Sequence, residues 1–277
     1  MKKAWRITSH TVQALPVPDD ASLDDLSHAW PQGFYTTFRT VDGARKVVGL
    51  SLHLARLYEP ARASGVPVAR AEGELRRVLD ALLAAWRPGE ARVRLHLATD
   101  GTFYLAIESF RPPPERLYEQ GVSAVTVPFR RESPRLKRSD YVEARRSALE
   151  RVRQAGAYEG LITHNGRIWE GLSSNFFYVR DGVLGTAKHN VLPGVTRAVL
   201  LRLARRLGIP RRYRALPVAD LPFIAEAFLC SSSRGPVPIV RVDDVPVGEG
   251  VPGPLTRRLL TAYRQEIRRI GESILGG

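Results

Sequence analysis

The stretch Trp169-Glu170-Gly171-Leu172-Ser173-Ser174-Asn175-Phe176-Phe177 places one carboxylate between two apolar segments. Ile168 and Trp169 lead into Glu170, and a small polar run separates it from the aromatic residues that follow. Burying a carboxylate costs free energy unless the group is paired. The pattern predicts a short strand, a polar turn and a second strand from Asn175. Glu170 is therefore either a rim residue at a strand end or a carboxylate kept for chemistry.

Downstream of this stretch, Leu192-Pro193-Gly194-Val195-Thr196-Arg197 opens a predicted helix. The apolar residues of this helix recur at helical spacing, and Gly208 stands at the C-terminal position that glycine favours. A helix N-terminus presents unpaired N–H groups and the positive end of the dipole, which suits a phosphate. Because most helices with such starts bind nothing, this segment alone is weak evidence for an anion site.

Two further segments carry groups capable of chemistry. Cys230-Ser231-Ser232-Ser233-Arg234-Gly235 follows an apolar strand and is either a plain polar turn or a loop of hydroxyls and amides that holds an anion. Lys137 is one of only five lysines among 42 basic residues. A lysine amine can lose its proton whereas a guanidinium cannot, so a chain this rich in arginine has one reason to keep lysine at a reactive position.

The first half of the chain reads as mixed α and β. An aromatic, β-branched strand over 34–40 stops at Asp42-Gly43, and two strands over 92–97 and 102–107 join at Asp100-Gly101. Apolar spacing predicts helices near 52–61 and 71–86. The proline-rich run Arg111-Pro112-Pro113-Pro114-Glu115 suits a linker. We therefore expect an α+β protein with domains 1–114 and 115–277.

The second half continues with short elements. Strands are predicted over 124–129, 161–163, 175–179 and 227–229, and helices over 142–155 and 254–270.

Composition excludes several classes of protein. Of 277 residues, 44% are hydrophobic and 25% are charged, which argues against disorder, and one cysteine fits a reducing cytoplasm. No apolar run predicts a membrane helix or signal peptide, and no histidine spacing predicts a metal site. The net charge of +14 raises a nucleic-acid hypothesis, but the basic residues are spread along the chain without a binding motif. We expect a cytoplasmic protein with no nucleic-acid, membrane or metal partner.

Taken together and in this order, these motifs resemble the fold-type-IV (class IV) pyridoxal-phosphate enzymes. That family includes branched-chain aminotransferases, D-amino-acid aminotransferases and 4-amino-4-deoxychorismate lyases. The resemblance runs from about Gly33 to Tyr263. Its most specific parts are the Trp169–Phe177 stretch, the segment from Leu192 to Arg197, and His53-Leu54-Ala55-Arg56-Leu57. It implies a smaller N-terminal α/β domain and a larger C-terminal domain with a β-barrel-like core, with pyridoxal 5'-phosphate between them.

The resemblance also implies a role for each site residue. Lys137 forms the Schiff base with the cofactor and shuttles the substrate proton, and Glu170 pairs with the pyridine nitrogen. The phosphate ligands are Arg56, Val195, Thr196 and Ser232, and Tyr141 lies near the cofactor phenolate. The expected substrate-binding residues are Tyr35, Arg39, Arg94, Ser232 and Ser233.

The motifs favour a branched-chain-type enzyme without settling the subgroup. Val247-Gly248-Glu249-Gly250 and the position of Arg94 resemble the branched-chain enzymes. The step from Lys137 to Asp140 matches the D-amino-acid enzymes and the lyases better, but the Arg-Gly that both carry is missing after Thr99. We expect a homodimer that moves an amino group between an apolar amino acid and 2-oxoglutarate in a ping-pong reaction. The alternatives are a D-amino-acid aminotransferase and a 4-amino-4-deoxychorismate lyase.

Overall fold

The computed structural model describes residues 1–276, which form two compact units. The first unit contains Met1–Arg111, Leu136–Ala144 and the chain from Glu266 onward, and the second contains Pro112–Arg135 and Arg145–Gln265. The chain thus enters the second unit at Pro112, inside the proline-rich run. It returns briefly to the first unit for the segment that carries Lys137.

The first unit is built on a sheet of seven strands. In spatial order these strands are β17 (Gly271–Ser273), β4 (Lys46–Val48), β3 (Gly33–Val41), β5 (Ala91–Ala98), β6 (Phe103–Ser109), β1 (Lys2–Ile7) and β2 (Val12–Leu15). All pairs in this sheet are antiparallel. The strand that was predicted over 34–40 and the hairpin at Asp42-Gly43 are confirmed by β3 and β4.

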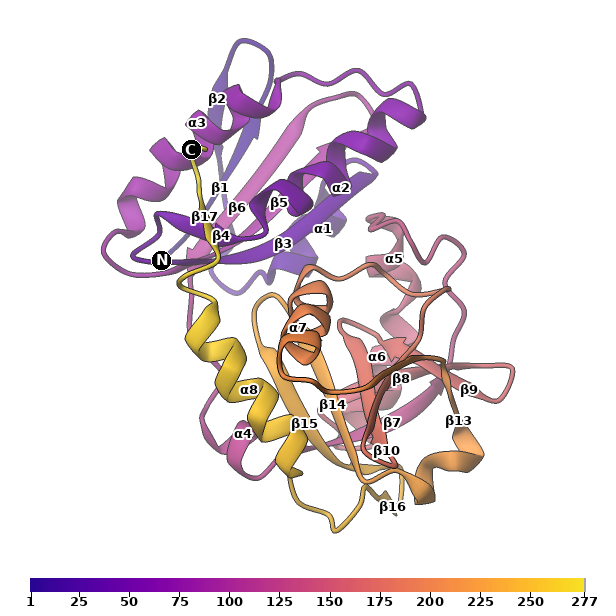
Figure 1. Ribbon diagram of the computed structural model, residues 1–277. Coiled ribbons are helices and arrows are strands. Elements are labelled where there is room, and N and C mark those ends of the chain that lie inside the picture. Colours follow the sequence, from indigo (N-terminus) through magenta and orange to yellow (C-terminus); the bar gives the residue numbers. More distant parts are fainter. Residues whose placement is uncertain (277) are drawn as a thin grey trace. The chain divides into compact units, whose positions relative to one another are not determined.

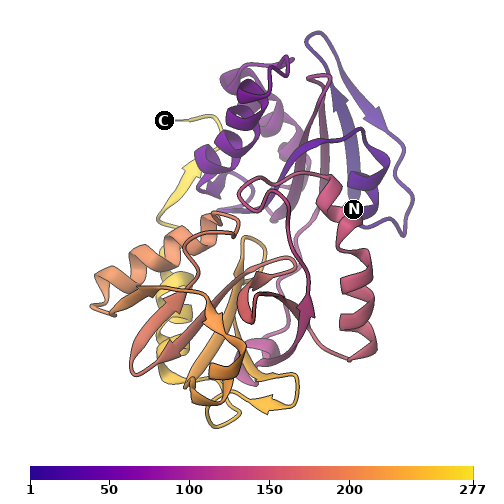
Figure 2. The same ribbon diagram turned by 90° about the vertical axis from the view of Figure 1, so that its right-hand side faces the viewer.

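Side-chain alternation gives this sheet two different faces. The residues Val93, Leu95 and Leu97 of β5 pack in one apolar core with helices α2 (Leu50–Ala63) and α3 (Glu72–Leu83). These helices lie over one face of the sheet (Figures 1 and 2). The other face meets the short helix α1 (Leu23–Ala29) through Ala4 and Ala106. Because side chains alternate along a strand, Tyr35, Arg39 and Arg94 share the α1 face.

The second unit is built on a larger sheet that closes on itself. The six strands of the closed part are β10 (Asn175–Arg180), β14 (Glu226–Ser231), β15 (Gly235–Val242), β7 (Val122–Pro128), β8 (Glu159–His164) and β9 (Arg167–Gly171). The pairing of Glu170 with Asn175 joins β9 back to β10. The expected β-barrel-like core is confirmed, and the pair that closes it contains Glu170.

Shorter elements extend and cover this barrel (Figure 1). The remaining strands are β11 (Val183–Thr186), β12 (Arg211–Tyr213), β13 (Leu216–Pro217) and β16 (Val245–Pro246). The helical segments are α4 (Arg116–Glu119), α6 (Arg146–Gln154), α7 (Val195–Arg206), η2 (Val218–Phe223) and α8 (Pro254–Glu266). Gly208 has a φ of 70° after α7, which confirms the predicted helix end. Within residues 1–276, no helix is both long and apolar enough to cross a membrane.

The helix that was predicted over 142–155 is wrong as a single element. It is two helices, α5 (Asp140–Ala144) and α6, separated at Arg145. Arg145 is only 5% exposed, and its Nη1 donates to the carbonyl oxygen of Leu172 at 3.1 Å. The interruption falls where the chain passes from the first unit to the second. Apolar periodicity does not report such a passage, because both helices keep their own buried face.

Candidate functional site

Glu170 is a buried carboxylate surrounded by donors. It is 2% exposed at the end of β9, and its Oε2 accepts hydrogen bonds from Asn175 Nδ2 at 3.2 Å and from the Leu192 amide at 2.9 Å. Its Oε1 accepts from Arg131 Nη1 at 2.8 Å. Three donors converge on this group, one of them the guanidinium of Arg131. The carboxylate that the sequence singled out is thus paired and held in one orientation by hydrogen bonds.

Arg131 is a functional candidate that sequence reasoning missed. Its side chain is 8% exposed and forms an ion pair with Glu170 inside the second unit. Removing one partner of a buried ion pair leaves an uncompensated charge and costs several kcal/mol. In the sequence, Arg131 stands in the basic run Phe129-Arg130-Arg131, where nothing distinguishes it from its neighbour. Only the fold shows which arginine is buried.

Leu192 ties Glu170 to the start of α7. Its amide donates to Glu170, and its carbonyl oxygen accepts from Asn175 Nδ2 at 2.9 Å. Gly194 follows, and a Cβ there would lie 2.0 Å from Asn175 Oδ1, so only glycine fits. The sequence predicted Asn175 only as the start of a strand. In the structure, its side chain hydrogen-bonds both the Glu170 carboxylate and the Leu192 backbone just before α7.

The first turn of α7 has donors without protein acceptors. Gly194 provides no side-chain cap, and the turn has no acidic residue. Val195 and Thr196 are each 4% exposed, and among residues 1–276 neither their amides nor the Thr196 hydroxyl has a hydrogen-bond acceptor. A buried helix start without a cap is unusual unless a ligand satisfies it. This donor set fits a phosphate group.

Arg197 adds positive charge to the same turn. Its guanidinium donates to the Ala187 carbonyl oxygen at 2.6 Å and to Thr186 Oγ1 at 3.4 Å. Burial disfavours its charge and lowers its pKa, an effect that Cys230, Tyr213 and Glu170 only partly oppose. Within the described chain it has no carboxylate ion-pair partner, so its charge is not cancelled locally. The start of α7 is therefore electropositive.

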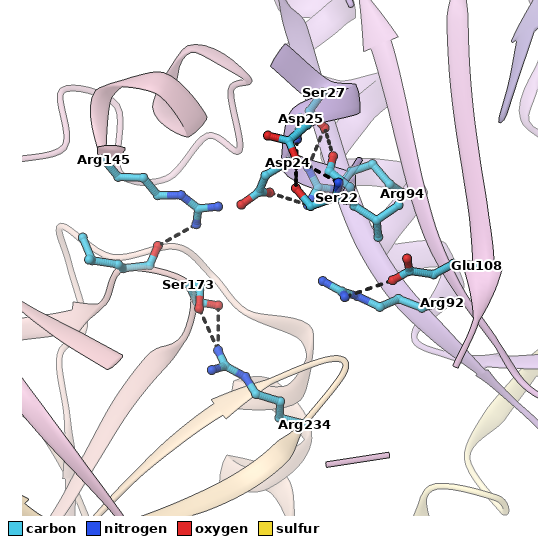
Figure 3. A network of polar contacts seen from close by, with 12 residues as sticks. Ser22, Asp24, Asp25, Ser27, Arg92, Arg94, Glu108, Arg145, Ser173 and Arg234 are labelled. Carbon is cyan, nitrogen blue, oxygen red and sulfur yellow. Dashed lines mark hydrogen bonds and ion pairs between the residues drawn. The ribbon is translucent and has the colours of Figure 1, made fainter. Parts of the chain in front are cut away.

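The β14–β15 turn contains Ser232, Ser233 and Arg234. The Arg234 side chain reaches across to β8 and to the loop after Glu170. Its Nη2 donates to Glu159 Oε2 at 3.1 Å and to Ser173 Oγ at 2.8 Å, as Figure 3 shows for Ser173. Its Nε donates to Ser231 Oγ at 3.0 Å. The predicted anion-binding turn is thus fixed to the Ser173 loop by a half-buried side chain.

The first unit holds Lys137 beside the start of β3. The Tyr35 amide donates to the Lys137 carbonyl oxygen at 2.8 Å, and the neighbouring Phe34 and Arg138 form an antiparallel bridge. The Lys137 Nζ lies 4.5 Å from the centre of the Tyr35 ring. The ring stabilises a nearby cation through its quadrupole. Tyr35 is 1% exposed, so this contact also fixes where the amine lies.

Arg94 approaches the same tyrosine ring from β5. Its Cζ lies 4.5 Å from the ring centre, and its terminal nitrogens donate to Asp24 Oδ1 at 2.9 Å and to Ser27 Oγ at 2.5 Å. Figure 3 shows this cluster on α1. Both terminal nitrogens of Arg94 therefore already have acceptors. Arg39 lies on the same sheet face and stacks its guanidinium on Phe110 at 4.8 Å.

Arg56 lies on α2, one turn after His53. The His53 Nδ1 and Thr36 Oγ1 share a hydrogen bond of 2.6 Å that joins α2 to β3. Burial, with the nearby charges of Arg56 and Lys137, lowers the pKa of His53 well below its usual value. A neutral His53 therefore lies near both cations. Tyr141 follows Lys137 on α5 and is 9% exposed.

The sequence-predicted residues thus fall into two groups. Tyr35, Arg39, Arg56, Arg94, Lys137 and Tyr141 belong to the first unit, where Tyr35 meets both Lys137 and Arg94. Glu170, Val195, Thr196, Ser232 and Ser233 belong to the second unit, where Leu192 joins Glu170 to the start of α7. The residues that sequence reasoning gave no role are Arg131, Asn175 and Arg234.

Comparisons with known proteins agree with these motifs. The family model for class IV aminotransferases matches residues 33–242. The D-alanine aminotransferase of Bacillus licheniformis is 25% identical over 271 residues, covering 88% of this chain and 91% of that protein. The branched-chain-amino-acid aminotransferase of Escherichia coli K12 is 34% identical over 154 residues, covering 52% of this chain and 50% of its own length.

A solved structure extends the likeness to the whole fold. A putative branched-chain amino acid aminotransferase from Thermotoga maritima has a TM-score of 0.77 and 27% identity, covering 96% of this chain and 95% of its own. With the match of the family model over most of the chain, these similarities lead to one conclusion. The chain belongs to the class IV aminotransferases, a family of pyridoxal-phosphate-dependent enzymes.

Proposed function

We propose that this class IV aminotransferase transfers an amino group from an apolar, branched-chain-type L-amino acid to 2-oxoglutarate, in two half-reactions. The similarity to branched-chain enzymes in sequence and fold supports this substrate class. We also propose that the enzyme is a cytoplasmic homodimer, which the single cysteine and the family resemblance support.

One observation carries the proposal most directly. In the second unit, Leu192 connects a buried carboxylate to a helix start whose donors have no protein acceptor among residues 1–276. Pyridoxal phosphate has a ring nitrogen that binds a proton at one end and a dianionic phosphate at the other. Glu170 complements the first and the α7 turn complements the second. The charges of the chain therefore match both ends of the cofactor on one connected piece of structure.

The cofactor, when bound, supplies an electron-accepting ring for the electron pair released at the substrate α-carbon. Glu170 would hold a proton on the ring nitrogen, and Arg131 and Asn175 would keep the carboxylate aligned. The Val195 and Thr196 amides, with the Thr196 hydroxyl, would bind the phosphate together with Arg56 and Ser232. Tyr141 is proposed to donate a hydrogen bond to the cofactor phenolate.

Lys137 is the proposed catalytic amine. Lys137 would bind the cofactor covalently until the substrate amine displaced it, and its freed amine would take the proton from the substrate α-carbon and deliver it to the C4′ carbon of the cofactor. The Tyr35 ring places the Lys137 Nζ, since the amine lies 4.5 Å from the ring centre. The neutral His53 nearby adds no positive charge to a site that already contains Arg56 and Lys137.

Substrate recognition is proposed for residues of both units. Tyr35, Arg39 and Arg94 share one face of β3 and β5, and Ser232 and Ser233 form the turn after β14. Asp24 and Ser27 already accept hydrogen bonds from the two terminal nitrogens of Arg94. We therefore propose that Arg94 positions the Tyr35 ring, which lines the substrate side-chain pocket, rather than binding the substrate itself. An apolar wall with satisfied polar groups behind it suits an apolar substrate side chain.

A second candidate is a D-alanine aminotransferase. Relatives with that activity in their names match nearly the whole chain, at 25–28% identity over 88–95% of its length. The branched-chain relatives have higher identity over a shorter stretch. The two candidates differ in the face of the substrate from which the proton leaves, which no single motif of the chain decides.

A substrate panel with the cofactor-loaded enzyme tests the proposal. L-leucine with 2-oxoglutarate should yield L-glutamate, and D-alanine should yield no pyruvate. If the enzyme turned over D-alanine but not L-leucine, the second candidate would be its function. Pyruvate release from 4-amino-4-deoxychorismate without any amino acceptor would assign a lyase. A Lys137→Ala variant is the control, because every one of these reactions should disappear with it.

A further inference from the structure

Arg234 is a half-buried arginine to which the proposed reaction has so far given no role. It lies at the end of the Ser232-Ser233 turn, and its side chain is 19% exposed. Burial disfavours its charge, but Glu159 and the Tyr158 phenol outweigh that cost and raise the pKa of Arg234. It is therefore a cation held beside the Ser232-Ser233 turn, which belongs to the proposed substrate-binding residues and is suited to an anion such as the substrate carboxylate.

The guanidinium is anchored along one edge. Nε bonds Ser231 Oγ, and Nη2 bonds both Glu159 Oε2 and Ser173 Oγ. These hydrogen bonds use Nε and Nη2, and the guanidinium also hydrogen-bonds the Tyr158 phenol. Four acceptors among the described residues thus take four of its five N–H groups, which leaves one Nη1 N–H for another acceptor. An arginine whose side chain is already ordered loses little further entropy when it binds a carboxylate.

Glu159 is the carboxylate that holds the Arg234 guanidinium in place. It is 3% exposed at the start of β8 and also accepts hydrogen bonds from the hydroxyls of Ser173 and Ser174, at 2.6 and 3.2 Å. These serines stand in the loop that follows Glu170. The same network therefore connects the loop after the catalytic carboxylate with the β14–β15 turn. The Tyr118 hydroxyl fixes the backbone of the turn by donating to the Arg234 carbonyl oxygen at 2.7 Å.

We infer that Arg234 is a substrate-binding residue whose Nη1 donates to the carboxylate bound at the Ser232-Ser233 turn, with Glu159 and Ser173 as its positioning residues. The inference rests on the proposed function, because it needs a carboxylate substrate at that turn. The turn amides provide two donors from the backbone, and Arg234 adds a charged donor from the side chain. Hydrogen bonds to charged partners are about twice as strong as neutral ones.

Calorimetric titration of the cofactor-loaded protein tests the inference with two probes. The first is 4-methylvalerate, which has a carboxylate, and the second is 4-methylpentanamide, which has the same shape without the charge. Arg234→Gln should weaken 4-methylvalerate binding roughly tenfold, as expected for one lost charged hydrogen bond. It should leave amide binding unchanged. Arg234→Lys should restore part of the loss.

Arg241→Gln is the matched control, because Arg241 lies on β15, the strand that follows Arg234, and has a 52% exposed side chain. It removes the same charge and should change neither affinity. If Arg234→Gln destabilises the fold, the double variant Glu159→Gln/Arg234→Gln removes both buried charges and should keep the selective loss.

Equal weakening of both probes, or unchanged 4-methylvalerate binding, would overturn the inference. These titrations need no turnover. If L-leucine is not turned over but Arg234→Gln still weakens 4-methylvalerate binding selectively, only the proposed substrate is contradicted.

Discussion

The N-termini of α7 and α8 lie in the same unit and differ in how their first amides are satisfied. At α8, the Glu226 carboxylate accepts from the Leu255 amide at 2.9 Å and from the Thr256 amide at 2.7 Å. At α7, the amides of Val195 and Thr196, the first two residues of the helix, have no acceptor among the described residues. The N-terminus of α8, which serves only the fold, is capped by a carboxylate of the protein. The N-terminus of α7 has no such cap and is therefore suited to an external anion.

Glu170 and Glu226, both buried in this unit, should respond differently to loss of charge. Glu170→Gln should lower turnover roughly 100-fold or more, because a neutral amide does not hold a proton on the cofactor nitrogen. Glu226→Gln should change turnover little, since Glu226 serves only α8. Steady-state kinetics at saturating cofactor measure both. Similar turnover in the two variants would remove the distinction between the two carboxylates.

The closed helix start should matter most for stability. Glu226→Ala should lower the free energy of unfolding by about 2–3 kcal/mol, because the amides of Leu255 and Thr256 lose their acceptor. Urea unfolding of the cofactor-free protein measures this loss. Thr196→Val is the comparison at α7 and should change stability by less. An unfolding free energy that is unaffected in Glu226→Ala would show that the cap is not stabilising.

The open helix start should matter most for phosphate binding. Thr196→Val should weaken binding of pyridoxal phosphate about tenfold and leave pyridoxal, which has no phosphate, unaffected. Thr256→Val is the matched change at α8, where the hydroxyl is buried without a hydrogen-bond partner. It should leave both affinities unchanged. Absorbance titration of the cofactor-free protein gives the four constants, and equal losses for the two ligands in Thr196→Val would contradict a phosphate site at α7.

The sequence predicted most regular elements because their signals are local. The Asp42-Gly43 turn, the helical spacing before Gly208 and the apolar β14 strand each depend on neighbours in the chain. The closure of the barrel was predicted only through the family resemblance, because the Glu170–Asn175 pairing depends on tertiary structure. The interruption at Arg145 between α5 and α6 was not predicted for the same reason.

The candidate site divides in the same way. Glu170 and Thr196 belong to motifs with recognisable spacing, so the sequence identified them. Arg131 and Arg234 resemble many other arginines in a chain with 42 basic residues, and only burial beside Glu170 and Glu159 distinguishes them. A residue whose role depends on a distant partner has no signal of its own in a single sequence.

The most direct test of the account is the visible absorbance of the purified, pyridoxal-phosphate-loaded protein before and after L-leucine is added. We expect a cofactor band that shifts with L-leucine, does not shift with D-alanine in a separate sample, and is absent from Lys137→Ala. A shift with D-alanine alone would contradict the proposed substrate and keep the family chemistry. No band after incubation with pyridoxal phosphate would contradict the central claim that Lys137, Glu170 and the start of α7 serve this cofactor.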